Sequence, residues 1–308
     1  MSNFVATILC AAVLATGMPA ATPSETGNTV RMTVTANVEK DKRFPQIERG
    51  DVIVKNGDSP LAVKDWAAAK GERAGLELFF VIDEASSSSL GGQLDDLRAF
   101  IQAQPETTAV GIAYARNGTV EVRQELTRDH AAAAKALRLP LSSAGAFGSP
   151  YLSVTDLMQR WRSSENRREV ILITDGIDRA GRGHNALANP DIDTAAHMAL
   201  KTGTMLHSIY FPGAGHRFHS LWYATMGQNG LAKLTDATGG ESFFLGTQTP
   251  VSLAPYFEQL QRILDNQYLL TVTVQPGKKA GMQYVNVITE VAGVDFSAPG
   301  AVWVPAVQ

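Results

Sequence analysis

Long apolar runs alternate with amphipathic stretches through the middle of the chain. Residues 76–83 ("LELFFVID"), 169–175 ("EVILITD") and 204–211 ("TMLHSIYF") are nearly uninterrupted apolar runs, which is typical of strands buried on both faces. Between them, residues 90–101 carry apolar side chains at helical spacing, and residues 190–203 begin with Pro and end with Gly, as helices do. Strands that alternate with helices predict an α/β fold with a doubly wound, mostly parallel sheet flanked by helices.

The two ends of the chain have a different pattern. Residues 29–38, 51–63, 266–279 and 282–306 alternate apolar with polar side chains and are joined by Gly-containing turns, which predicts β-strands. Each end has too few strands to bury a face alone. We therefore predict that they combine into a small β-sandwich domain, and two separate flanking hairpins remain the alternative.

These patterns predict three segments. Residues 1–21 form a signal peptide, residues 28–70 and 266–306 form the discontinuous β-domain, and residues 75–265 form the α/β domain. The first segment has an apolar run from Phe4 to Val13 followed by small residues, although no Lys or Arg precedes the run. It predicts an exported protein, periplasmic or secreted.

Composition narrows the chemistry. The single cysteine, Cys10, lies inside the predicted signal peptide, so a processed chain has no thiol for disulfides, zinc binding or catalysis. The 308 residues carry a formal net charge of −3 with the signs mixed along the chain, which gives no indication of a nucleic-acid partner. No later segment is long and apolar enough to predict a stable membrane span in the mature chain.

Acidic residues end two of the predicted buried strands. Asp83 ends the first and is followed by a run of serines, and Asp175 ends the second. The carboxyl ends of neighbouring parallel strands lie at one edge of a sheet, where ligands bind. Two carboxylates there repel each other unless a cation, a proton or hydrogen-bond donors compensate. Carboxylate and hydroxyl oxygens suit Mg²⁺ or Mn²⁺, whereas a polar turn is the simpler interpretation of the serine run.

These residues resemble a known family. Asp83 with Ser87, "TDG" at 174–176, and the strand and helix alternation are similar to a von Willebrand factor A-type domain. More specifically, the chain resembles the VWFA-related proteins abundant in Acidobacteria, over roughly residues 45–305. The resemblance implies a doubly wound sheet and a metal-ion-dependent adhesion site, built from Asp-x-Ser-x-Ser, a Thr and an Asp. Proteins of this family usually bind protein partners through that metal.

Carried over by position, the resemblance implies a metal site for Mg²⁺ or Mn²⁺. Its ligands would be Asp83, Ser87, Ser149 and Asp175, with Ser153 and Thr155 as weaker alternatives to Ser149. If a metal binds, a partner carboxylate would complete its coordination. The match departs at Ala85, because a methyl group stands where the motif has a hydroxyl ligand. The neighbouring Glu84 is expected to be solvated.

Other candidate sites have weaker support. His216 and His219 have a spacing that could hold zinc but lack a third ligand at a recognised offset. Residues 181–191 form a polar, Gly-rich loop after the Asp175 strand that could determine specificity. The aromatic residues of the α/β domain are expected to pack in the core or between helices; they include Trp161, Trp222 and Tyr223.

The sequence supports three functional hypotheses. The first is an exported, non-enzymatic module that binds a protein or extracellular ligand at the crevice of Asp83, Ser87, Ser149 and Asp175. The second is a metal-independent structural or assembly module, which Ala85 supports. The third is a serine hydrolase, although no Gly-x-Ser-x-Gly motif is present. Specificity in this fold lies in loop surfaces.

Overall fold

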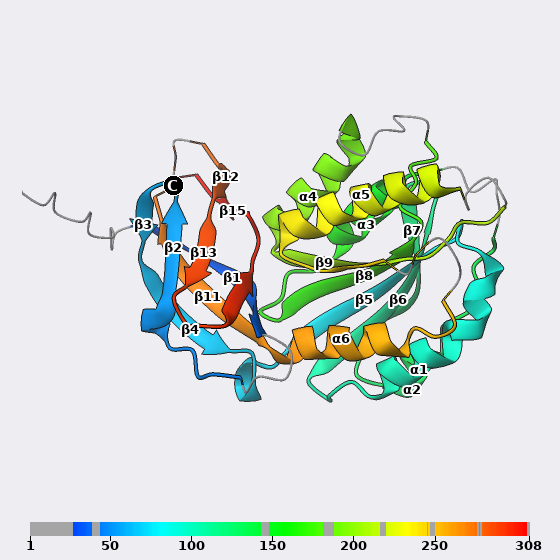
Figure 1. Cartoon of the computed structure of the whole chain (residues 1–308), viewed down its shortest axis with the longest axis horizontal. Helices are drawn as coiled ribbons and strands as arrows, with labels where there is room; N and C mark the ends of the chain where they lie inside the picture. Colours follow the sequence, from blue (N-terminus) through cyan, green and yellow to red (C-terminus); the bar gives the residue numbers. More distant parts are fainter. Residues whose placement is uncertain are drawn as a thin grey trace, which may run out of the picture.

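The fold is described from a computed structural model of the chain (Figure 1). The described residues are 27–38, 44–142, 148–180, 188–215, 220–244, 246, 250–275, 277 and 279–306. The predicted signal peptide, residues 1–21, lies outside them. Within the described ranges, no helix combines the length and apolar character needed to span a membrane.

A six-stranded sheet forms the centre of the larger part of the molecule, in the order β10-β9-β8-β5-β6-β7. Its pairings are parallel except that of β6 with β7. Every residue of the central β5 is buried, as its apolar run predicts. The predicted α/β fold with a mostly parallel sheet is confirmed. The strands are β5 (Leu76–Asp83), β6 (Thr108–Arg116), β7 (Thr119–Thr127), β8 (Arg167–Thr174), β9 (Thr204–Tyr210) and β10 (Ser242–Phe243).

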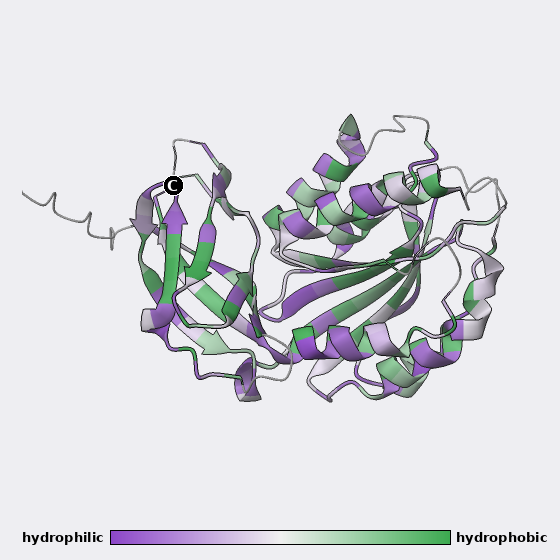
Figure 2. Cartoon of the chain, in the orientation of Figure 1, coloured by the Kyte–Doolittle hydropathy of each residue, from purple (hydrophilic) through white to green (hydrophobic). Residues whose placement is uncertain are grey.

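Helices cover both faces of this sheet (Figure 1). One face bears α1 (Leu94–Gln102), α2 (His130–Lys135) and α6 (Ala254–Asp265). The other bears α3 (Pro150–Arg160), α4 (Pro190–Thr202) and α5 (Leu221–Thr238). Successive β5 side chains point to opposite faces, so each face has its own core, and Figure 2 shows the apolar strands between the two helical layers. A short 3₁₀ helix, η3 (Ser88–Gln93), joins β5 to α1.

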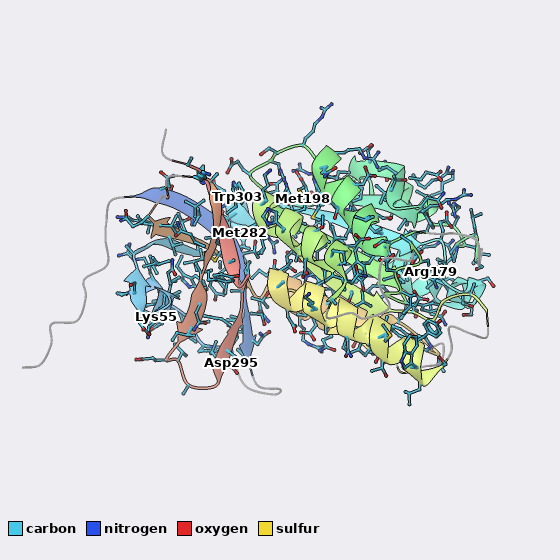
Figure 3. All side chains as sticks on the ribbon, turned by 90° about the horizontal axis from the view of Figure 1, so that it is seen from above. Lys55, Arg179, Met198, Met282, Asp295 and Trp303 are labelled. Carbon is cyan, nitrogen blue, oxygen red and sulfur yellow. The ribbon has the colours of Figure 1, made fainter. Side chains whose placement is uncertain are left out.

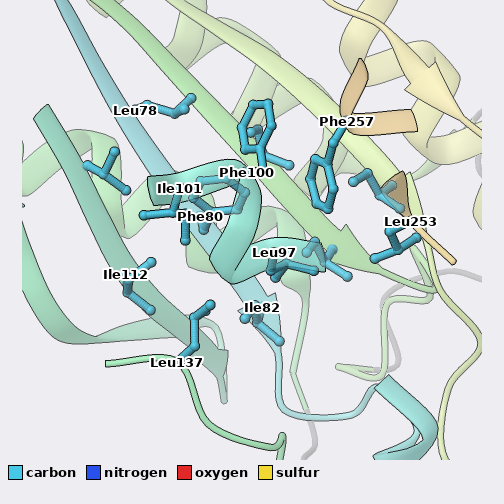
Figure 4. Close-up of a cluster of buried hydrophobic side chains, with 14 of the residues drawn as sticks. Leu78, Phe80, Ile82, Leu97, Phe100, Ile101, Ile112, Leu137, Leu253 and Phe257 are labelled. Carbon is cyan, nitrogen blue, oxygen red and sulfur yellow. The ribbon is translucent and has the colours of Figure 1, made fainter. Parts of the chain in front are cut away.

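Phe80 lies at the centre of the α1 face (Figure 4). Its ring meets Phe100 of α1 at a centroid distance of 6.0 Å and Phe257 of α6 at 6.4 Å. Phe100 and Phe257 stack at 4.7 Å. These contacts attach both helices to the strand that ends in Asp83, so the core on this face positions the candidate site.

Helix ends follow the sequence in one case and depart from it in another. α4 begins at Pro190 and ends before Gly203, whose φ of 66° is the left-handed conformation that favours glycine. For α2, Thr127 precedes the Ala-rich run and is the hydroxyl residue that the sequence offers as a cap, but the structure does not use it. Asp129 caps the helix by accepting a hydrogen bond from the N–H of Ala132, because Thr127 still belongs to β7.

The strands at the two ends of the chain pair with each other. β1 (Asn28–Val38) lies between β11 (Gln267–Val274) and β14 (Val294–Ser297), and β11 also pairs with β4 (Val63–Ala68). β2 (Val52–Asn56) lies between β3 (Ser59–Leu61) and β13 (Asn286–Thr289). A separate hairpin joins β12 (Gly281–Tyr284) to β15 (Ala301–Val304), and the 3₁₀ turns η1 (Arg49–Asp51) and η2 (Gly71–Arg73) complete this part.

One apolar core links these small sheets. It joins side chains of β1, β2 and β11, and Trp66 of β4 stacks on Tyr268 of β11 with ring centroids 4.3 Å apart. The extra antiparallel strands therefore accompany the α/β part as expected. The division into a β-domain of residues 28–70 and 266–306 and an α/β domain of 75–265 remains a proposal.

We predict that Phe80→Ala lowers the free energy of unfolding by about 3–5 kcal/mol, because it leaves a cavity between β5, α1 and α6. Urea denaturation followed by circular dichroism measures the change. Tyr284→Ala is the matched control, since this side chain is 78% exposed, and its loss should stay within about 0.5 kcal/mol. Equal losses in the two variants would contradict the central place of Phe80.

Candidate functional site

The candidate site lies where the strand order of the central sheet reverses direction. β5 pairs with β6 on one side and with β8 on the other, and loops at such a point form the usual ligand crevice of open α/β sheets. Asp83 ends β5, and Asp175 follows β8 directly. The structure thus brings the two predicted acidic residues to one edge. Thr174, the residue before Asp175, is hydrogen-bonded to Asp83 although 91 positions separate them in the sequence.

Asp83 has protein partners for both of its carboxylate oxygens. Oδ1 accepts a hydrogen bond from the N–H of Ala85 at 2.9 Å, and Oδ2 accepts one from the Thr174 hydroxyl at 2.6 Å. The residue is only 6% exposed. Burial raises the pKa of Asp83, Arg179 opposes that shift, and the negative charge of Asp175 adds to it. The positive charge of Arg179 therefore favours the ionised form of this carboxylate.

Arg179 supplies that positive charge. Its guanidinium binds Asp175 in a bidentate pair, Nη1 to Oδ1 at 3.0 Å and Nη2 to Oδ2 at 2.5 Å. The two side chains are 6% and 2% exposed. Burial alone would lower the pKa of Arg179, but attraction to Asp175 and Asp83 outweighs burial and raises it. A permanent cation thus lies between the two acidic strand ends.

The same arginine fixes neighbouring loops. Its backbone N–H donates to the carbonyl of Gly148 at 2.8 Å, which ties the loop after β8 to the start of α3. Gly213 covers the ion pair so closely that a Cβ there would lie 2.2 Å from Asp175 Oδ2. A larger residue at position 213 would have to displace the pair. The residues around Arg179 therefore form a packed, largely closed arrangement.

Ser149 joins this arrangement, and Ser87 does not. Ser149 is 1% exposed and caps α3. With Asp83, Ser153 and Arg179 it lines a cavity of about 10 Å³, which is room for about one water molecule. Ser87 is half-buried, is not among the residues that line this cavity, and accepts hydrogen bonds from the N–H and hydroxyl of Ser89 as the cap of η3. The other alternative, Thr155, donates within α3 to Tyr151.

The side chains in this arrangement do not supply the oxygen ligands that a divalent metal needs. Mg²⁺ requires near-octahedral oxygen ligands at about 2.0–2.1 Å, but both oxygens of Asp175 bind Arg179 and Ala85 contributes no oxygen from its side chain. A guanidinium at this position would also repel the ion. Among the described residues, no group of three or more His, Cys, Asp or Glu side chains could hold a metal.

Glu84 corrects an expectation. It is 1% exposed, not solvated. Its carboxylate accepts hydrogen bonds from both terminal nitrogens of Arg138 and from the N–H of Leu141 at 2.6 Å. Arg138 also lies 3.9 Å over the ring of Tyr114, and its pKa is raised by the hydrogen bond with Glu84. This second ion pair, between a buried carboxylate and a partly exposed guanidinium, fixes the 138–141 segment against the loop after β5.

The sequence interpretation missed Arg179 and Thr174. Both belong to "TDGIDR" at 174–179, a segment in which the sequence analysis assigns a ligand role to Asp175 alone. An arginine four residues after a buried aspartate can fold back on it across a tight turn, and this spacing was the available indication. The Gly176 between them has a φ of 70°, the left-handed conformation that such a turn requires.

Several other candidates fall elsewhere. His216, His219 and most of the predicted specificity loop, residues 181–187, lie outside the described residues. Trp161 contacts Phe79 edge-on at 4.9 Å, as expected for a packed aromatic. Trp222 does not follow that expectation, because it is 54% exposed at the start of α5.

Comparisons with known proteins concern the fold. No protein-family model matches the chain, and no curated protein sequence matches it. Solved structures do, at low sequence identity. BatB from Bacteroides thetaiotaomicron, a conserved hypothetical protein, is 14% identical, with 61% of this chain and 97% of that chain covered and a TM-score of 0.45.

Two other solved structures are similar at the same level. The ArnB paralog VWA2 from Sulfolobus acidocaldarius is 10% identical, covering 91% of this chain and 76% of that chain with a TM-score of 0.40. Manganese-loaded Plasmodium vivax TRAP protein is 11% identical, covering 80% and 100% with a TM-score of 0.40. At these identities and TM-scores the likeness concerns the general fold and nothing further.

Proposed function

We propose that this protein is an exported, non-enzymatic binding module that engages a protein or extracellular ligand through the loops at the carboxyl edge of its central sheet. In this proposal Arg179 supplies the positive charge that a divalent metal supplies in the adhesion site of the family. The observation that supports it is the buried guanidinium of Arg179, bidentate on Asp175 and close enough to Asp83 to oppose the rise in its pKa.

The proposal replaces metal dependence with a built-in cation. Mg²⁺ or Mn²⁺ held by Asp83, Ser87, Ser149 and Asp175 remains the competing form of the site. In that form Arg179 has to release Asp175, and Ser87 has to give up the hydrogen bonds that it accepts as the cap of η3. Since removing one partner of a buried pair costs about 3–5 kcal/mol, a metal would have to offset that cost in addition to its own dehydration.

Exposed apolar side chains at the same edge support a binding role. Among the described residues, most large hydrophobic side chains that are exposed lie in loops at this edge or at helix ends next to it. They are Leu139, Leu141, Leu221, Trp222, Phe244 and Val251. Two others, Tyr284 and Ile288, lie on β12 and β13. Aromatic and aliphatic anchors in loops held by a rigid scaffold are typical of protein-binding surfaces.

A structural or assembly module is the second candidate. It is favoured by the closure of the site, because Asp83, Ser149 and Asp175 are each at most 6% exposed. In that case the ion pair only stabilises the loops and no ligand binds at this edge. The export of either module follows from the predicted signal peptide.

We expect no binding of Mg²⁺ or Mn²⁺ to the wild-type protein at concentrations up to about 1 mM, because Arg179 occupies the oxygens of Asp175. Isothermal titration calorimetry and thermal unfolding with and without each ion measure this. Asp175→Ala is the control for a specific site. Heat of binding in the wild type that disappears in Asp175→Ala would show a metal site and overturn the built-in cation.

We expect Arg179→Met to destabilise the protein by about 3–5 kcal/mol near pH 7, because two buried carboxylates lose their cation. Burial already raises the pKa of Asp83. Its ionisation therefore costs stability only as the pH rises above about 4, the ordinary pKa of an aspartic acid, towards the higher pKa of the folded state. Without Arg179 the folded pKa is higher still, so the destabilisation should shrink near pH 5, where a proton replaces the guanidinium.

Urea denaturation at the two pH values measures this dependence. Arg98→Met is the matched control, since Arg98 pairs with Asp95 at the surface, where Asp95 is 94% exposed. That change should cost under about 1 kcal/mol with little pH dependence. A loss in Arg179→Met that is equally large at both pH values would contradict the compensating role of Arg179.

Binding at the carboxyl edge is tested by affinity capture from the secreted fraction of the source organism in the presence of EDTA. We expect the wild type to capture a partner, and Leu221→Ser with Trp222→Ser to weaken capture by about thirtyfold, as for loss of a 2 kcal/mol anchor. Tyr284→Ser is the control on the β-strands. Loss of the partner on adding EDTA would favour the metal form of the site. Capture that is equally strong with the double variant would favour the structural module.

A further inference from the structure

A larger cavity lies at the other edge of the central sheet, away from the candidate site. It has a volume of about 360 Å³, within the range of about 300–1,000 Å³ typical of small-molecule sites. Its walls come from β1, the starts of β8 and β9, the end of α4, and β15. Figure 3 places Trp303 and Met198 at this junction and Arg179 at the far end of the molecule.

The charged residues that line this cavity all have the same sign. They are Arg31, Arg167, Arg168 and Lys201, and the lining contains no Asp or Glu. The guanidinium of Arg167 binds the carbonyls of Ala74 and Leu264 and the side chain of Gln267, none of which lines this cavity. In a chain with a formal charge of −3, such a concentration of cations is local. A concave site lined by one sign of charge concentrates ions of the opposite sign. The lining therefore favours an anion.

Arg167 and Arg168 are both buried, and the one whose guanidinium bonds a residue of the cavity lining, Thr202, is Arg168. Its side chain is 8% exposed, and the nearest carboxylate oxygen, Glu77 Oε2, lies 4.0 Å from its Nε. Its terminal nitrogens donate to carbonyl oxygens, Nη2 to Arg162 at 2.8 Å and Nη1 to Thr202 at 3.5 Å. Burial lowers the pKa of Arg168 despite Glu77. An anion in the cavity would offset the cost of burying this charge.

Lys201 and Arg31 stand at the more exposed side. Lys201 lies on the last turn of α4, with its Nζ 5.3 Å from the centre of the Trp303 ring, and it makes no ion pair with another described residue. Arg31 pairs at 3.2 Å with Glu165, which is 95% exposed. A surface pair of this kind contributes little. Arg31 also donates from Nη2 to the carbonyl of Glu165 at 2.6 Å, so Lys201 is the cation that is most readily available to a ligand.

The rest of the lining is apolar. Met32 of β1, Leu269 of β11, and Val302 and Trp303 of β15 contribute to it. Figure 3 shows Trp303 beside Met198 where the two parts of the molecule meet. A cation cluster next to an aromatic and aliphatic wall matches a ligand that has an anionic group on an apolar body. A bare inorganic ion would use only the cations.

We infer that the cavity between the central sheet and the β1–β11 sheet is a binding site for a small organic anion, with its charged group near Arg168 and Lys201 and its apolar body against Trp303 and Met32. This inference is independent of the proposed function at the carboxyl edge. It needs neither Arg179 nor a partner protein.

The test uses benzoate and phenyl phosphate as probes, with benzamide as the uncharged counterpart of benzoate. We expect both anions to raise the thermal unfolding temperature and to give a heat of binding in calorimetry, whereas benzamide does neither. The stronger of the two anions identifies the preferred charged group. Added sodium chloride should weaken binding, since part of the site is exposed.

Lys201→Gln is the informative variant because Lys201 is exposed and its loss leaves the fold intact. We expect its dissociation constant for the anion to rise about tenfold, as for loss of one charged hydrogen bond. Lys55→Gln, on β2 and away from the cavity (Figure 3), should bind as the wild type does. The inference is overturned if neither anion binds, if benzamide binds equally, or if Lys201→Gln binds unchanged.

Discussion

Two carboxylates at the ends of adjacent buried strands require a positive charge, and this requirement organises the carboxyl edge of the protein. Asp83 and Asp175 are both almost fully buried, so neither solvent nor salt can compensate them. Arg179 does so from only four residues beyond Asp175. Its backbone also holds Gly148, and the 212–214 segment closes over the pair. One local ion pair therefore connects the loops after β5 and β8 with the start of α3.

Much of the architecture follows directly from the sequence pattern. The apolar runs at 76–83 and 169–175 become β5 and β8, because strands buried on both faces tolerate few polar residues. Their acidic ends could then be placed at one edge from the parallel pairing alone. What a single sequence could not supply was the direction of individual side chains. Glu84 follows Asp83 immediately but turns to Arg138, which is 54 residues away.

The family motif predicted where the site lies better than it predicted which side chains contribute to it. Asp83, Ser149 and Arg179 line one cavity, yet Ser87, which fits the motif, caps η3 instead. A hydroxyl at the right spacing can satisfy a helix cap as readily as a metal, and spacing does not distinguish the two uses. Arg179 has no counterpart in the motif. Only the three-dimensional arrangement shows that its guanidinium pairs with Asp175 and that its charge also acts on Asp83.

The pairing of β1 with β11 has a consequence for the order of folding. Asn28 is opposite Val274 in this ladder, so the first described strand can form its hydrogen bonds only after nearly the whole chain has been synthesised. Contacts so distant in sequence form slowly because a long loop must close first. The central α/β part, whose strand pairings span shorter stretches of chain, can fold earlier. Until then β1 remains an unpaired strand, and closing the chain ends completes the native structure.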